Sequence, residues 1–136
     1  MKKVGIVFGC WDLLHPGHLM FLDSASKMCD ELLVGLQSDP SLDRPVKNRP
    51  IQTLYERALQ LDFISVGDII PYSHESDILL ILQNNPDINV RFLGTDYLDK
   101  DFTGKKYCEE NGIEIVYINR SHNLSTSELR NRIKES

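Results

Sequence analysis

The chain has 136 residues, of which 41% are hydrophobic and 26% are charged, as in globular proteins and unlike disordered or collagen-like chains. Fifteen basic and twenty acidic residues give a net charge of −5, which argues against binding of nucleic acid through its phosphates. No apolar run approaches the roughly 18 residues that cross a bilayer, and the N-terminal segment turns polar too early for a signal peptide. We therefore expect one cytoplasmic domain over residues 1–136, with no nucleic-acid or membrane partner.

Apolar runs of strand length alternate along the chain with amphipathic segments of helix length. The runs expected to be strands are 4–8, 31–36, 68–72, 89–93 and 114–118. The segments expected to be helices are 17–28, 53–63, 76–83, 104–111 and 125–134. This alternation predicts an α/β fold, a Rossmann-like doubly wound parallel five-stranded sheet with helices on both faces. In such a sheet a ligand binds beyond the carboxyl ends of the strands, where the strand order reverses.

The first expected strand is followed by the segment GCWDLLHPGH at 9–18, which turns and then begins a helix at a proline. His15 and His18 are three residues apart at this helix start, so both side chains can face the same side. The free N–H groups of a helix N-terminus bind anions, and two imidazoles beside them can donate hydrogen bonds to a phosphate. Two histidines at this spacing, taken alone, could also be surface residues or metal ligands. Gly9 and Asp12 at fixed offsets favour the anion site.

The loop at 37–52 is long, polar and basic in its second half, where Arg44, Lys47 and Arg49 alternate with prolines. Loops of this length inside a compact domain commonly have a function. A solvated run of charges would give the same pattern for the two arginines.

Polar segments also follow the fourth and fifth expected strands. The first is Gly-Thr-Asp at 94–96, whose aspartate could contact a ligand or only stabilise a turn. The second is RSHNLSTS at 120–127, in which Ser125 and Glu128 fit a capping box for the last helix. The N-terminus of that helix, together with Arg120, could also hold a polyphosphate.

These motifs resemble the nucleotidyltransferases with a His-x-Gly-His signature, which here is His-Pro-Gly-His at 15–18. The family's Gly-x-Phe-Asp is matched by Gly-Cys-Trp-Asp at 9–12, and its Arg-x-x-x-(Ile/Leu)-Ser-Thr-(Ser/Thr) by Arg120 with residues 124–127. The resemblance covers nearly the whole chain and is closest to the small cytidylyltransferases, such as the glycerol-3-phosphate enzyme. It implies transfer of CMP from CTP to a small phosphorylated acceptor, first choice glycerol 3-phosphate to give CDP-glycerol, with release of pyrophosphate.

The resemblance also implies which residues would act. The expected catalytic residues are His15, His18, Lys47 and Arg120. The expected nucleotide-binding residues are Gly9, Cys10, Trp11, Asp12, Gly17, Arg57, Gly94, Asp96, Ser125, Thr126 and Ser127. Mg²⁺ would be bound mainly through the nucleotide triphosphate, so no protein metal site is expected. The resemblance further implies a homodimer.

Two alternatives stay open. The chain could be an adenylyltransferase that uses ATP on a sugar phosphate or FMN, since Arg49-Pro50 is similar to the heptose-phosphate adenylyltransferases and the pattern at 94–97 does not distinguish purine from pyrimidine. It could also be a nucleotide-sensing domain without turnover. The intact histidine pair, Lys47 and the Ser-Thr-Ser segment argue against this second alternative.

Overall fold

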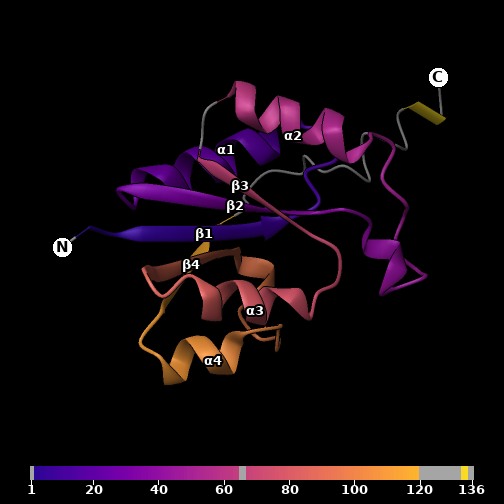
Figure 1. Ribbon diagram of the computed structural model, residues 1–136. Helices are drawn as coiled ribbons and strands as arrows, with labels where there is room; N and C mark the ends of the chain where they lie inside the picture. Colours follow the sequence, from indigo (N-terminus) through magenta and orange to yellow (C-terminus); the bar gives the residue numbers. More distant parts are fainter. Residues whose placement is uncertain (1, 65–66, 120–132, 135–136) are drawn as a thin grey trace.

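A computed structural model describes residues 2–64, 67–119 and 133–134. Five parallel strands form one sheet in the order β3-β2-β1-β4-β5 (Figure 1). Their bounds are β1 (Val4–Gly9), β2 (Glu31–Gln37), β3 (Asp68–Tyr72), β4 (Ile88–Gly94) and β5 (Glu114–Ile118). The predicted doubly wound Rossmann-like sheet is confirmed, with each strand end within one residue of its expected position. The strand order reverses between β1 and β4.

Helices cover both faces of the sheet. Their bounds are α1 (Pro16–Lys27), α2 (Leu54–Phe63), α3 (Asp77–Asn84) and α4 (Lys105–Glu110), with 3₁₀ turns η1 (Pro40–Leu42) and η2 (Thr95–Tyr97). Helices α1 and α2 lie on one face and α3 and α4 on the other (Figure 1). The last expected helix, 125–134, falls almost wholly outside the described residues. None of the described helices is long and apolar enough to span a membrane.

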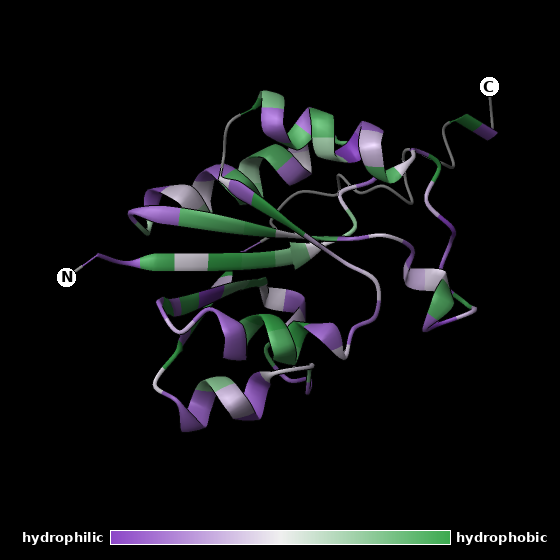
Figure 2. Cartoon of the chain, in the orientation of Figure 1, coloured by the Kyte–Doolittle hydropathy of each residue, from purple (hydrophilic) through white to green (hydrophobic). Residues whose placement is uncertain are grey.

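The sheet separates two apolar clusters. Strands buried on both faces are hydrophobic along most of their length, as Figure 2 shows for β1 and β2. Phe21 and Leu22 of α1 pack with Val90 and Phe92 of β4 in the first cluster. The second cluster includes Ile78 and Leu82 of α3 and Cys108 of α4. Because side chains alternate along a strand, the residue between Val90 and Phe92 projects to the α3–α4 face. That residue is a charged one, Arg91.

Candidate active site

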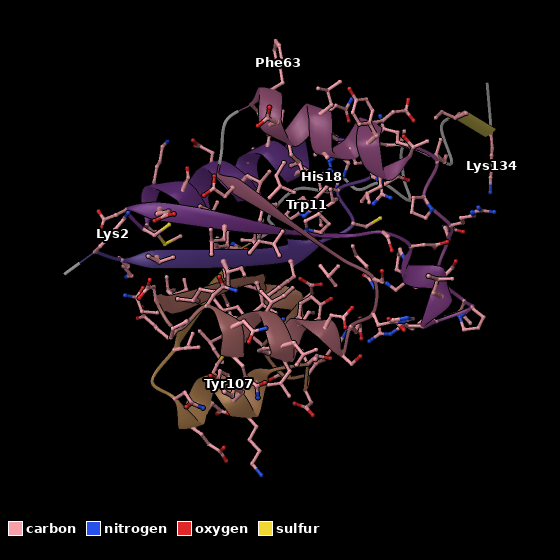
Figure 3. All side chains as sticks on the ribbon, viewed as in Figure 1. Lys2, Trp11, His18, Phe63, Tyr107 and Lys134 are labelled. Atoms are coloured by element: carbon pink, nitrogen blue, oxygen red, sulfur yellow. The ribbon has the colours of Figure 1, made fainter. Side chains whose placement is uncertain are left out.

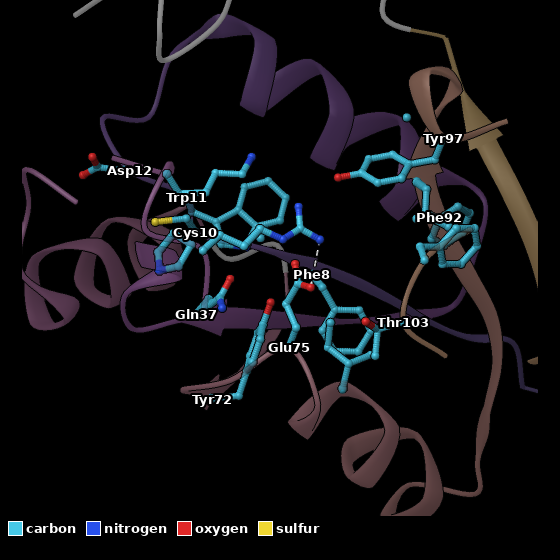
Figure 4. A pocket seen from close by; sticks show the side chains of 18 of the residues that line it. Phe8, Cys10, Trp11, Asp12, Gln37, Tyr72, Glu75, Phe92, Tyr97 and Thr103 are labelled. Atoms are coloured by element: carbon cyan, nitrogen blue, oxygen red, sulfur yellow. Dashed lines mark hydrogen bonds and ion pairs between the residues drawn. The ribbon is translucent and has the colours of Figure 1, made fainter. Parts of the chain in front are cut away.

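A pocket of about 390 Å³ opens at the carboxyl ends of the strands, beside the reversal of strand order. Its size suits a small-molecule ligand, and its place is the one that the fold predicts. The walls come from the segment after β1, the end of β4, the loop after β2 and the residues that precede α4. In Figure 4, Asp12 and Cys10 lie at one end of this pocket, and Tyr97, Phe92 and Thr103 lie at the other.

Trp11 fixes the turn that follows β1. Its backbone has a left-handed φ of 54°, a conformation that costs a non-glycine residue on the order of 1–3 kcal/mol. The indole is 5% exposed, and its Nε1–H donates to the carbonyl of Gly35 at 2.9 Å. A Cβ at Gly9 would lie only 3.0 Å from the indole, so glycine leaves the space in which the ring packs. The buried ring therefore holds the turn in its strained conformation while it also lines the pocket.

His15 and His18 form a capping box at the start of α1. The Nδ1 atom of His15 accepts a hydrogen bond from the N–H of Gly17 at 3.0 Å, and the Nδ1 atom of His18 accepts one from the N–H of His15 at 3.3 Å. The two rings are stacked, with centroids 3.8 Å apart. His18 also lies edge-on to Trp11, with ring centroids 5.6 Å apart; both residues are labelled in Figure 3.

These caps determine which nitrogen of each imidazole can donate. An Nδ1 that accepts from a backbone N–H carries no proton, so the neutral ring holds its proton on Nε2. Both rings of the pair therefore present Nε2–H as their donor, and both lie beside the positive end of a helix dipole. Because His18 lines the pocket and His15 stacks on it, the pair forms a preset donor site for an anion.

Asp12 joins the turn after β1 to the loop between β2 and α2, residues 38–53. Its two carboxylate oxygens accept the backbone N–H groups of Ile51 and Gln52, each at 2.9 Å. The side chain of Gln52 in turn accepts the N–H of Leu13 at 2.8 Å. Asp12 as a whole is 4% exposed. It therefore holds the C-terminal end of the loop, and its contact with a nucleotide stays a prediction.

Arg57 is buried beneath the same loops, with 2% of its surface exposed. Its guanidinium donates to the carbonyls of Cys10 at 3.0 Å, Gln37 at 2.6 Å and Ser38 at 2.6 Å. Its Nε–H is shared by the carbonyls of residues 52 and 53. Arg57 does not line the pocket. Instead it joins the segments that leave β1 and β2, so its position fits a supporting role.

A second set of contacts joins the loop at 38–53 to the connection between β3 and α3. Asp43 accepts the backbone N–H of Glu75 at 2.7 Å and lies 2.7 Å from Nδ1 of His74. The backbone hydrogen bond from Glu75 and the contact with His74 lower the pKa of Asp43. The hydrogen bond and the charge of Asp43 raise the pKa of His74. We call this contact of Asp43 with His74 and Glu75 the latch.

Lys47 lies between the latch and the Asp12 contacts, exposed and on the wall of the pocket. The other basic residues of the loop are near carboxylates, since Arg44 pairs with Glu75 at 3.0 Å and Arg49 lies 3.9 Å from Asp39. Within the described residues, Lys47 forms no ion pair. Its charge is therefore available to a ligand in the pocket.

Arg91 is a pocket residue that the sequence analysis missed. It is 4% exposed, and its guanidinium carbon lies 5.0 Å from the ring centre of Phe8 and 4.7 Å from that of Phe102. One terminal nitrogen donates to the carbonyl of Thr103. The sequence feature that could have identified Arg91 is its charge inside the apolar run 89–93. In a strand buried on both faces, a charged side chain cannot reach solvent and needs another partner.

Apart from His15 and Arg57, the expected site residues divide into three groups. The ones that line the pocket are Gly9, Cys10, Trp11, Asp12, His18, Lys47 and Gly94. Gly17 is buried in the first turn of α1, and Asp96 is exposed on η2; neither is part of the pocket lining. The ones outside the described residues are Arg120, Ser125, Thr126 and Ser127. Across residues 2–64, 67–119 and 133–134, no group of three or more His, Cys, Asp or Glu side chains could hold a metal ion.

Comparison with known proteins gives consistent results. A family model described as cytidylyltransferase-like matches residues 6–132. The bifunctional protein HldE of Helicobacter hepaticus is 38% identical over 140 residues, which cover 100% of this chain and 28% of that protein. HldE of Haemophilus influenzae (strain PittEE) is 33% identical over 135 residues, which cover 98% of this chain and 28% of that protein. The chain thus spans little more than a quarter of the length of these relatives.

Solved structures show the same fold. A lipopolysaccharide core biosynthesis protein from Thermoplasma volcanium aligns with a TM-score of 0.66 and 24% identity, over 88% of this chain and 96% of that one. A pantoate-beta-alanine ligase from Francisella tularensis aligns with a TM-score of 0.58 and 17% identity, over 99% of this chain and 71% of that one.

Proposed function

Because the chain belongs to the cytidylyltransferase-like family, we propose that it transfers CMP from CTP to a small phosphorylated acceptor and releases pyrophosphate. Glycerol 3-phosphate is the first acceptor to test, with CDP-glycerol as its product. The observation that carries the proposal is the stacked pair of His15 and His18, with fixed donors, at the helix start beside the pocket.

The reaction needs positioning and charge stabilisation more than covalent chemistry by the protein. A phosphate oxygen of the acceptor attacks the α-phosphorus, and the bond from that phosphorus to the bridging oxygen of the β-phosphate breaks. Negative charge grows on the α-phosphate oxygens and on the departing pyrophosphate. The Nε2–H groups of His15 and His18 would donate to the α-phosphate. Donors that are already oriented lower the barrier because they need no reorganisation during the reaction.

The remaining phosphates would be held by cations and a second helix start. Two observations support this role for Lys47: it is exposed on the pocket wall, and it has no ion-pair partner within the described residues. Arg120 and Ser125, Thr126 and Ser127 complete the proposal by their match to the family signature. Mg²⁺ would neutralise triphosphate charge, with phosphate and water as its main ligands.

An adenylyltransferase that uses ATP on a sugar phosphate is the second candidate. The sequence feature that favours it is Arg49-Pro50, in the loop that carries Lys47. This proline-rich loop lies along the pocket through Pro40, Arg44 and Asn48, so its shape bears on substrate choice. Both candidates share the chemistry at the histidine pair and differ only in base and acceptor.

Pyrophosphate release in the presence of Mg²⁺ distinguishes the candidates. CTP and ATP are each supplied with a panel of acceptors led by glycerol 3-phosphate, and His18→Ala serves as the inactive control. Release with CTP that the variant abolishes supports the proposal, and release with ATP alone supports the second candidate. Tight nucleotide binding without release from either nucleotide, across the panel, contradicts both and favours a sensing domain.

A further inference from the structure

Among the residues that the structure describes, the buried Arg91 has no counter-charge. Across the described residues no carboxylate pairs with it, and its Nε atom is buried without a hydrogen-bond partner. Buried cations in proteins are normally paired, because loss of water around a charge is unfavourable. Burial accordingly lowers the pKa of the Arg91 guanidinium, although an arginine stays protonated under ordinary conditions. The pocket lining thus contains a guanidinium to which an anion could bind.

The groups around Arg91 fix the orientation of its guanidinium but do not neutralise its charge. The rings of Phe8 and Phe102 lie against the guanidinium, and the carbonyl of Thr103 accepts from one terminal nitrogen. Gly104 leaves room for it, because a Cβ there would lie 3.0 Å from that nitrogen. Aromatic faces and a carbonyl orient a cation but supply no negative charge to it.

The carboxylates that line the same pocket have other partners. Glu75 pairs with Arg44, and Asp101 accepts the backbone N–H of Phe102 at 3.0 Å. Asp12 accepts two backbone N–H groups. None of them therefore takes the position of a counter-ion to Arg91.

The position of Arg91 separates it from the histidine pair. His18 belongs to α1, on one face of the sheet, whereas the Arg91 side chain leaves β4 toward the α3–α4 face. The pocket therefore has an anion-binding group on each side of the carboxyl edge of the sheet. Nucleotidyl transfer brings two anionic substrates together, and two separated sites would match them.

We infer that Arg91 binds the phosphate group of the acceptor and so determines that the acceptor is a phosphorylated compound. This inference rests on the proposed nucleotidyl transfer, because it assigns one of the two substrates of that reaction. The second terminal nitrogen of the guanidinium would donate to the phosphate oxygens, because the first already donates to Thr103 and the Nε atom is buried. A hydrogen bond from a charged guanidinium to a phosphate oxygen is among the stronger ones in proteins.

The test measures binding separately from turnover. Glycerol 3-phosphate and inorganic phosphate are titrated calorimetrically into the whole chain, for the wild type and for Arg91→Gln, Arg91→Lys and Lys106→Gln. Lys106 is the matched control, because its side chain is 88% exposed and its removal changes the net charge equally. We expect Arg91→Gln to weaken phosphate binding on the order of 10- to 100-fold. The phosphate affinity of Arg91→Lys should lie between those of Arg91→Gln and the wild type, and the affinity of Lys106→Gln should equal that of the wild type.

The same variants separate a binding role from a structural one. In steady-state assays Arg91→Gln should raise the KM for the acceptor and leave the nucleotide affinity within about twofold, a split that loss of folding alone does not produce. If Arg91→Gln does not fold, Arg91→Lys is compared with the wild type instead, provided that its Tm equals that of the wild type. Unchanged phosphate binding and acceptor KM in a folded Arg91 variant would overturn the inference, as would no phosphate binding by the wild type. Arg91-dependent binding without turnover would leave it standing and count against the proposed function.

Discussion

Replacement of His15 can separate the capping role that its imidazole has in the structure from the donor role that we propose for it. Its Nδ1 atom caps α1 by accepting the N–H of Gly17 at 3.0 Å, and its Nε2–H is proposed to donate to the α-phosphate. Alanine removes both functions. Asparagine is among the best N-cap residues, so His15→Asn retains an acceptor for the helix and removes the imidazole donor.

The two variants should therefore differ in stability and agree in activity. Loss of an N-cap costs about 1 kcal/mol, which corresponds to a fall in Tm of about 4 °C for a chain of this length. His15→Ala should show this fall, and His15→Asn should remain near the wild type. Loss of a preorganised donor lowers kcat on the order of 100-fold or more, and we expect this loss in both variants.

Thermal unfolding followed by circular dichroism gives the first comparison, and pyrophosphate release at saturating nucleotide gives the second. Activity of His15→Asn within a few-fold of the wild type would refute the donor role, because capping alone would then explain the residue. Equal Tm values for the two variants would refute the capping argument.

Three further predictions concern the groups that hold the loop at 38–53. Asp12→Asn keeps one of two acceptors for the loop N–H groups, so the free energy of unfolding should fall by about 1–3 kcal/mol in urea titrations; an unchanged midpoint would contradict this assignment. Arg57→Met leaves several buried carbonyls without a donor and should lower stability by at least about 2 kcal/mol, with Arg57→Lys intermediate. The pKa of Asp43 is lowered from its ordinary value of 3.8, and the pKa of His74 is raised from its ordinary value of 6.5. The latch should therefore be fully formed between pH 3.8 and 6.5. It should be lost as pH rises through the raised pKa of His74 or falls through the lowered pKa of Asp43. Hydrogen exchange of the loop should therefore speed up above neutral pH relative to a reference segment, and His74→Gln should remove that pH dependence.

The sequence predicted the features that depend on local pattern. Apolar runs located the strands because parallel strands buried on both faces leave few polar positions. The confirmed doubly wound sheet predicts a ligand site at the carboxyl ends of its strands, and the pocket lies there. The segment at 9–18 was also a local pattern, and the structure places His18 and Trp11 from it on the pocket wall.

Features that depend on long-range contacts were not predicted. Asp12 meets backbone groups 39 and 40 residues away, and Arg57 meets a carbonyl 47 residues away. Such distances give no periodic signal, so both residues could be expected only as binding residues by resemblance. Arg91 was missed because its apolar neighbours identify the strand, whereas its own environment comes from Phe102 and Thr103 of a later segment.

The packing of Trp11 has a practical consequence. It is the only tryptophan in the sequence, and its indole lies between the core and the pocket, 5.6 Å from the ring of His18. The intrinsic fluorescence of the unlabelled chain therefore comes from tyrosines and from this one indole. Excitation selective for tryptophan isolates the emission of a single group beside the proposed phosphate donors. Ligand binding, loop opening and unfolding can thus be followed with the native chain and no added dye.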